Sequence, residues 1–156
     1  MTDKSKELSA SITLINDKLH FTGNVAGNEP VSIDYIPTLG DNLGYTSLEL
    51  LLLSLSSCVG SAVLLFLRKM KKSITRCEIS AKGLRHEEHP TGFKRINVEI
   101  HLESPDVTSE VMKKVIALSE DKYCPVYAML KGNTAIEINF KINAGECSGA
   151  ELIATN

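Results

Sequence analysis

The sequence of 156 residues predicts an α+β fold in which antiparallel sheets are arranged around one long central helix. Two observations support this class. Residues 50–67 form an uncharged run of apolar and small residues that is long enough for a buried helix. Before and after this run, apolar and polar residues alternate in short segments, which is the period of half-buried strands. Strands with one polar face and hairpin connections favour antiparallel pairing, with the apolar helix packed in the middle.

The first part of the chain predicts three short strands. Apolar residues alternate with polar ones over residues 10–14, and the alternation resumes over residues 19–21 after Asn16-Asp17. Two such runs around a pair of turn residues are typical of a hairpin on a two-residue turn. A third alternating segment covers residues 31–35, and a loop rich in turn-forming residues follows at residues 37–44.

The central helix is predicted from about residue 46 to residue 70, with Thr46 or Ser47 as its N-cap. Its uncharged part just reaches the length of a membrane span, but its serines, its glycine and the strands that follow favour a helix buried in a soluble core. A helix of this length would extend about 38 Å, more than the width of a compact domain of this mass. Because apolar residues occupy every side of it, we expect a homodimer that shares these helices between protomers.

The remaining residues predict two strands, two helices and a last strand. The expected elements are a strand at 74–84, a charged turn at 86–92, a strand at 96–102, an amphipathic helix at 109–122, a short helix that starts at Pro125 and stops at Gly132, and a strand at 136–142. Residues 144–156 are expected to form a loose tail. Because no repeat or linker interrupts this order, residues 1–156 are predicted to form a single domain.

Composition and charge exclude several function classes. Hydrophobic residues make up 43% and charged residues 23% of the chain, as in ordinary globular proteins, and the net charge is −2. This charge provides no basic surface for nucleic acid or for an anionic membrane. The N-terminal residues are polar and contain no apolar segment of a secretion signal, so we expect a cytoplasmic protein whose four cysteines are free thiols.

Two cysteines lie in surroundings that favour thiol chemistry. Cys124 precedes Pro125 and would occupy the N-cap of a short helix near Lys122, so unpaired N–H groups and a cation would lower its pKa. Cys58 lies inside the apolar helix, where burial would raise its pKa. The residues alone therefore rank Cys124 as the better nucleophile and Cys58 as its partner in a redox pair. A purely structural interpretation, in which Cys58 is one more buried apolar side chain, stays open.

The other candidate groups have simpler interpretations. Cys77 lies with Thr75 and Ile79 on one face of a strand and is predicted to lie in the core. Cys147 lies in the polar tail, where an exposed thiol could oxidise. The run His86-Glu-Glu-His89 carries the residue types of metal ligands, but its place in a turn next to Pro90 favours a solvated loop. We therefore predict no metal site and no cofactor.

Two motifs in the chain resemble a known family. The run from Glu49 to Cys58 resembles the ELLL-x-x-L-x-x-C helix of the OsmC/Ohr family of thiol-dependent peroxidases, and the run from Lys122 to Val126 resembles that family's second cysteine motif. The spacing between the motifs and the order of elements match over nearly the whole chain. Glu49 lies nine residues before Cys58 and the first arginine is Arg68, which is more similar to the less-characterised OsmC-like branch than to the hydroperoxide-resistance branch.

The resemblance implies a fold, an activity and site residues. The fold would be an intertwined α+β homodimer. Cys58 would attack the O–O bond of an organic hydroperoxide and become a sulfenic acid, Cys124 would resolve it into a disulfide, and an external thiol would supply the electrons. By this resemblance the attacking thiol is Cys58, which reverses the ranking from the residues alone.

Glu49 corresponds to the active-site glutamate of the family, and the resemblance makes it the third catalytic candidate. Nine residues of a regular helix place it on the opposite side from Cys58 and about 13 Å along the axis. A charge that stabilises the helix N-terminus is therefore its alternative role.

Three functions are compatible with these residues. The first is a thiol-dependent peroxidase for organic hydroperoxides, the second is a non-enzymatic protein that binds a small apolar ligand at the dimer interface, and the third is a thiol redox sensor. The hydroperoxide-resistance branch uses an arginine near its N-terminus, and the candidates to replace it in this chain are Arg68, Arg76, Arg85 and Arg95.

Overall fold

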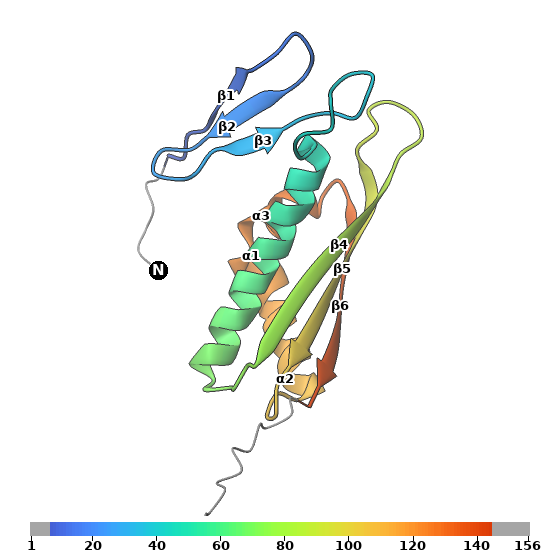
Figure 1. Cartoon of the computed structure of the whole chain (residues 1–156). Helices are drawn as coiled ribbons and strands as arrows, with labels where there is room; N and C mark the ends of the chain where they lie inside the picture. Colours follow the sequence, from blue (N-terminus) through green and yellow to red (C-terminus); the bar gives the residue numbers. More distant parts are fainter. Residues whose placement is uncertain (1–6, 145–156) are drawn as a thin grey trace, which may run out of the picture. The chain divides into compact units, whose positions relative to one another are not determined.

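The computed structural model describes residues 7–144, and their elements follow the predicted order of three strands, a helix, two strands, two helices and a strand (Figure 1). The elements are β1 Ser11–Leu14, β2 Phe21–Asn24, β3 Val31–Ile33, α1 Ser47–Lys69, β4 Arg76–Arg85, β5 Phe93–Glu103, α2 Ser109–Leu118, the π-helix η1 Ser119–Tyr123, α3 Pro125–Leu130 and β6 Ala135–Asn143. The α+β class is confirmed. Residues 145–156 of the predicted tail, with Cys147, lie outside the described residues.

The chain divides into two compact units, residues 1–51 and residues 52–156. Each unit contains one sheet of three strands, in the order β1-β2-β3 and in the order β4-β5-β6. The prediction of a single domain stays a prediction.

The N-terminal unit contains the expected hairpin, but its loop is longer than two residues. β1 pairs antiparallel with β2 up to Leu14 and Phe21, and Ile15 then donates its backbone N–H to the His20 carbonyl at 2.8 Å. The side-chain oxygen of Asn16 accepts backbone N–H bonds from Lys18 at 3.0 Å and from His20 at 3.3 Å. The two-residue turn was wrong because the Asn16 side chain builds its own turn and takes more residues out of the ladder.

Asp34 organises the loop that follows β3. Its side chain is 1% exposed, and its two carboxylate oxygens accept backbone N–H bonds from Tyr35 at 2.7 Å, Asp41 at 3.1 Å and Leu43 at 2.9 Å. Burial acts to raise the pKa of this carboxyl, but the three backbone bonds outweigh it and hold the pKa below its usual value. The loop is therefore held by one ionised side chain.

Replacing Asp34 with alanine should release this loop. Three backbone N–H groups would lose their acceptor, so we expect hydrogen exchange at Tyr35, Asp41 and Leu43 to accelerate by about tenfold or more. Because the pKa of Asp34 is lowered on folding, its contribution is present at neutral pH and is lost as the pH falls through the folded-state pKa. In the wild-type protein the same amides should lose protection in acid, and unchanged exchange in the alanine variant would contradict this role.

The C-terminal unit contains a mixed sheet, which corrects the prediction of purely antiparallel pairing. β4 and β5 pair antiparallel, whereas β5 and β6 pair parallel from Arg95 opposite Ala135 to Glu103 opposite Asn143. The segment between β5 and β6 contains α2, η1 and α3, and a connection of that length with helices is what a parallel neighbour requires.

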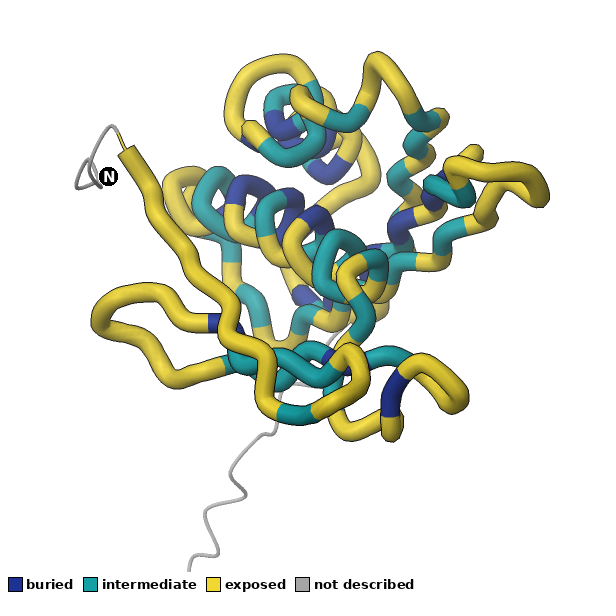
Figure 2. Tube along the Cα trace, turned by 90° about the horizontal axis from the view of Figure 1, so that it is seen from above, coloured by how far each residue is buried: buried dark blue, intermediate teal, exposed yellow. Residues whose placement is uncertain are grey.

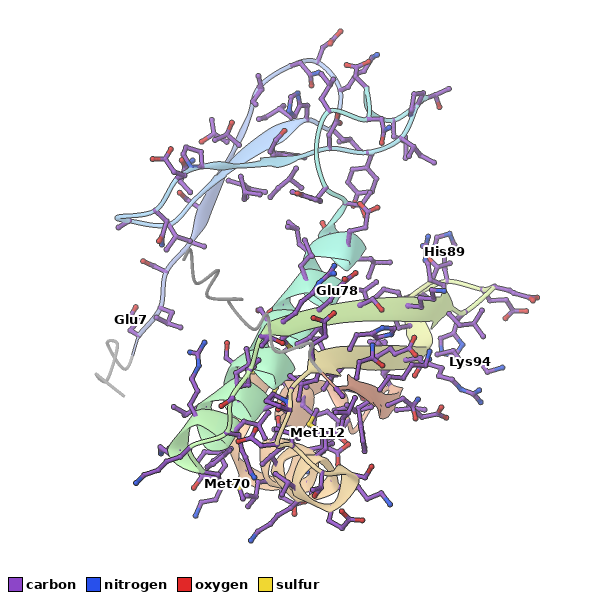
Figure 3. All side chains as sticks on the ribbon, turned by 60° about the horizontal axis from the view of Figure 1, so that its bottom comes forward. Glu7, Met70, Glu78, His89, Lys94 and Met112 are labelled. Atoms are coloured by element: carbon purple, nitrogen blue, oxygen red, sulfur yellow. The ribbon has the colours of Figure 1, made fainter. Side chains whose placement is uncertain are left out.

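This sheet has one apolar and one polar face. Along β5, buried residues alternate with polar ones, and α1 and α2 add buried residues to the same core. Buried positions recur at intervals along the helices in Figure 2, and Met112 of α2 lies where side chains crowd together in Figure 3. Among the described residues of this unit, the apolar side chains with no exposed surface are Leu55, Val59, Val63, Leu67, Ile96, Val98, Ile100, Met112 and Val115.

Helix α1 begins and ends within one residue of the predicted limits. By length and composition alone it is apolar enough to span a membrane, a property that it shares with core helices of soluble proteins, and 33% of its most apolar window is buried within the structure. Leu53 is 51% exposed on this helix. Such exposed apolar surface fits the expected homodimer, which stays a prediction.

Candidate functional site

The two cysteines that the sequence singles out lie side by side in the C-terminal unit. Cys58 lies in the middle of α1 and Cys124 lies directly before α3, 66 residues later. Their sulfur atoms are 2.7 Å apart, with Cys124 donating to Cys58, and both are free thiols. Two thiols in this arrangement can exchange a proton, and can form a disulfide when one of them is oxidised.

The serine hydroxyls next to Cys58 in the sequence bond to backbone carbonyls of α1. Ser56 donates its hydroxyl to the Leu52 carbonyl at 2.8 Å, and Ser57 donates to the Ser54 carbonyl at 3.0 Å. These hydroxyls satisfy themselves within α1, which explains how an apolar helix tolerates several serines. Cys58 itself is half-buried, whereas the sequence predicted a buried side chain.

A wide helical turn places Cys124. The sequence predicted one helix over residues 109–122, but α2 ends at Leu118 and the chain continues as the π-helix η1. The backbone N–H of Cys124 closes this turn on the Ser119 carbonyl at 2.9 Å, a bond that spans five residues. Pro125 then opens α3 with Cys124 as its N-cap, as predicted, and the Tyr127 N–H donates to the sulfur of Cys124 at 3.3 Å.

The pKa of Cys124 is raised to about 12, first by burial and then by the hydrogen bond to Cys58. Backbone N–H bonds from Tyr127 and Val126 act in the opposite direction but are the smaller effect. The prediction that the N-cap position would ionise this thiol was therefore wrong, because the side chain is only 2% exposed. Cys124 remains a neutral donor at physiological pH, and Cys58 is the acceptor.

This raised pKa gives the reduced protein a pH-dependent stability. An unfolded cysteine ionises near pH 8.5, so the contribution of burying neutral Cys124 is fully present below about pH 8.5 and is lost as the pH rises towards about 12. The urea midpoint of the reduced wild type should therefore fall more steeply between about pH 7.5 and about pH 10 than that of Cys124→Ser. Equal decreases of the urea midpoint in the two proteins would contradict the raised pKa of Cys124.

Glu49, the third candidate, is hydrogen-bonded to Thr46 at the start of α1. Its carboxylate accepts the Thr46 backbone N–H at 2.7 Å and the Thr46 hydroxyl at 2.8 Å, while its own N–H donates to that hydroxyl at 3.4 Å. These bonds lower the pKa of Glu49 and form a capping box at the start of α1. Thr46 is thus the N-cap, one of the two predicted. The catalytic role of Glu49 stays a prediction.

Two substitutions separate capping from chemistry at Glu49. Glutamine can preserve the capping box, so Glu49→Gln should keep the thermal midpoint and should keep peroxide consumption within about twofold of wild type. Glu49→Ala removes the bonds to Thr46 and should destabilise α1 by about 1 kcal/mol. A loss of consumption of about tenfold in Glu49→Gln, with an unchanged midpoint, would instead give the carboxylate a chemical role.

The four arginines that could replace the N-terminal arginine of the hydroperoxide-resistance branch bond other groups or are exposed. Arg76 pairs with Glu78 at 3.2 Å, and Arg85 donates to the Thr91 carbonyl at 2.8 Å. Arg68 and Arg95 are exposed on α1 and β5. Among residues 7–144 no hydrogen bond joins an arginine to either sulfur of the pair.

Among residues 7–144, no hydrogen bond joins the other predicted groups to the sulfur of Cys58 or Cys124. Cys77 is half-buried on the apolar face of β4, and burial raises its pKa, as expected for a thiol at the core. His89 lies in the exposed loop that joins β4 to β5 (Figure 3). Within the described part of the chain, no group of three potential ligands gathers around a metal position.

A ring contact next to Cys124 was not predicted from the sequence. The rings of Phe66 on α1 and Tyr123 at the end of η1 pack edge to face, with centroids 4.7 Å apart and planes at 69°. Lys69 lies over the Phe66 ring at 5.6 Å and Lys122 over the Tyr123 ring at 5.8 Å. The adjacency of Tyr123 to Cys124 was visible in the sequence, but its partner on α1 was not.

Comparison with known proteins places these motifs in a wider context. A family model described as "OsmC-like protein" matches residues 40–139. Protein YhfA of Escherichia coli K12 is 26% identical over 126 residues, which cover 81% of this chain and 92% of YhfA. A hypothetical protein from Aquifex aeolicus VF5 has a similar structure, with a TM-score of 0.79, 25% identity, and coverage of 91% of this chain and 100% of that chain. An organic hydroperoxide resistance protein from Elizabethkingia anophelis shares the fold, with a TM-score of 0.68, 22% identity, and coverage of 92% and 100%.

Proposed function

Because this chain belongs to the family of OsmC-like proteins, we propose that it is a thiol-dependent peroxidase that reduces organic hydroperoxides through Cys58 and Cys124. The observation that carries the proposal is the 2.7 Å approach of the two sulfurs, with Cys124 as a neutral donor. A hydroperoxide substrate is also compatible with the family, since one structural relative is named an organic hydroperoxide resistance protein.

The first step is attack by the Cys58 thiolate on a peroxide oxygen. Its electron pair forms an S–O bond, the O–O bond breaks, and the alkoxide takes a proton and leaves as an alcohol. Cys58 becomes a sulfenic acid and the peroxide has been reduced by two electrons. Cys124 donates its thiol hydrogen to Cys58 and stays neutral, which supports Cys58 as the attacking sulfur.

The second step is resolution by Cys124. Its sulfur attacks the sulfenic sulfur of Cys58, an S–S bond forms, and the sulfenic oxygen leaves as water with the proton of the Cys124 thiol. An external dithiol of the cytoplasm then reduces the disulfide by thiol–disulfide exchange and is itself oxidised. The cycle needs no cofactor, because the two cysteines carry both electrons.

Exposed apolar surface on α1 suits an organic substrate and a second protomer. Leu53 is 51% exposed on this helix, which also carries Cys58. In the proposed homodimer, apolar side chains of this kind would shield the thiols from water and would favour the alkyl group of an organic hydroperoxide over hydrogen peroxide.

The proposal is tested by peroxide consumption with dithiothreitol as reductant. Cumene hydroperoxide and hydrogen peroxide are supplied separately to the wild type and to Cys77→Ser, a matched thiol control outside the pair. We expect catalytic turnover in both proteins, with kcat/KM at least about tenfold higher for the organic peroxide. A single slow stoichiometric oxidation would instead indicate a redox sensor, and no oxidation at all would leave the ligand-binding function.

A further inference from the structure

We propose that Phe66 and Tyr123 are positioning residues that keep Cys124 beside Cys58 while the attacking thiol is oxidised, an inference that rests on the proposed peroxidase function. The assignment comes from the way in which the segment that carries Cys124 is attached to α1.

Most bonds of that segment are internal. Cys124 donates its N–H to Ser119, its sulfur accepts from Tyr127, and its carbonyl accepts from Ala128. These bonds fix the shape of residues 119–130 but do not join them to α1. Among the hydrogen bonds and ring contacts of residues 7–144, the segment meets α1 at two points, the Cys58–Cys124 sulfurs and the Phe66–Tyr123 rings.

The catalytic cycle weakens one of these two points. The contact between the sulfurs is a single hydrogen bond that Cys124 donates to the Cys58 sulfur, and oxidation of Cys58 to a sulfenic acid makes that sulfur a poorer acceptor. Of the two contacts, the ring contact is the one that this oxidation leaves unchanged. Since the rings lie about two helical turns from Cys58 and directly next to Cys124, they can stay packed while the sulfurs separate.

The time that Cys58 spends as a sulfenic acid decides its fate. Attack by Cys124 gives the disulfide and water, whereas a second hydroperoxide oxidises the sulfenic acid to a sulfinic acid and leaves as an alcohol. Holding Cys124 close raises its effective concentration and favours the disulfide. Phe66 and Tyr123 thus raise the fraction of Cys58 that becomes the disulfide and lower the fraction that becomes the sulfinic acid, without touching the substrate.

The test compares Tyr123→Ala with Tyr123→Phe, which keeps the ring, and with Met129→Ala, which truncates an exposed side chain of the same segment outside the ring contact. Each reduced protein is mixed with cumene hydroperoxide without reductant, and mass spectrometry follows loss of the free Cys58 thiol, the disulfide and the sulfinic acid. In Tyr123→Ala we expect loss of the thiol within about twofold of wild type. Disulfide formation should be about threefold to tenfold slower, with the sulfinic fraction raised by a similar factor, because the ring pair shifts the segment's population by that amount.

The outcomes separate this inference from the proposed function. A wild-type ratio of disulfide to sulfinic acid in Tyr123→Phe and in Met129→Ala would support positioning by the rings. Wild-type disulfide formation in Tyr123→Ala, or an equal slowing in Met129→Ala, would overturn it while leaving the peroxidase intact. If Tyr123→Ala lowers the thermal midpoint strongly, Phe66→Leu, which keeps apolar volume but no ring, decides by the same readout. A wild type that forms no disulfide would overturn both proposals.

Discussion

Replacing Cys58 with serine should lower kcat/KM for cumene hydroperoxide by about a thousandfold or more, because a hydroxyl is not ionised at neutral pH and cannot replace the attacking thiolate. The fold should survive this change. Cys58 is only half-buried, and a serine hydroxyl at that position can donate to a carbonyl of the preceding helical turn, as Ser56 and Ser57 do.

Coupled consumption of dithiothreitol measures this loss, with circular dichroism as the check on folding. Cys77→Ser is the matched control, since it removes another half-buried thiol of the same unit. Activity in Cys58→Ser equal to that of the control would remove the attacking role from Cys58 and would return the ranking to Cys124.

Replacing Cys124 with serine should have a different effect. The first oxidation of Cys58 still occurs, but the sulfenic acid has no neighbouring thiol to resolve it. At millimolar dithiothreitol we expect steady-state turnover to fall by about a hundredfold, because an intramolecular thiol acts at a far higher effective concentration than a free one. Successive additions of peroxide should then inactivate the variant as the sulfinic acid accumulates on Cys58.

A sulfenic-acid trap such as dimedone distinguishes the two cysteine variants. Cys124→Ser should give one dimedone adduct on Cys58 after one equivalent of peroxide, and Cys58→Ser should give none. A dimedone adduct on Cys124 in the Cys58→Ser variant would contradict the assigned order, in which the thiol of high pKa resolves and does not attack.

Much of the fold follows from hydrophobic periodicity alone. The uncharged run predicted a helix at about 46–70, and the structure has α1 at Ser47–Lys69. An apolar run of that length is too long for a single strand, so a buried helix is the structure that fits it. Alternation predicted β5 for the same kind of reason. Periodicity does not state which strand pairs with which, so the parallel placement of β6 beside β5 was missed.

The candidate site shows a different limit. Both cysteine motifs are legible in the sequence, but the 2.7 Å contact joins residues 66 positions apart and depends on how α1 and α3 pack. The π-turn at Ser119–Tyr123 was not predicted, because one extra residue in a turn leaves the apolar pattern of α2 unchanged. The protonation of Cys124 was misjudged for a similar reason, since the N-cap position is visible locally and burial is not.

Peptide mass spectrometry of the reduced wild type after one equivalent of cumene hydroperoxide shows whether Cys58 and Cys124 act as a redox pair. We expect one disulfide-linked peptide pair that contains Cys58 and Cys124, with the loss of two hydrogens and the release of one equivalent of alcohol. Peptides in which both thiols remain alkylatable, or in which Cys58 is joined to another cysteine while Cys124 stays free, would contradict it.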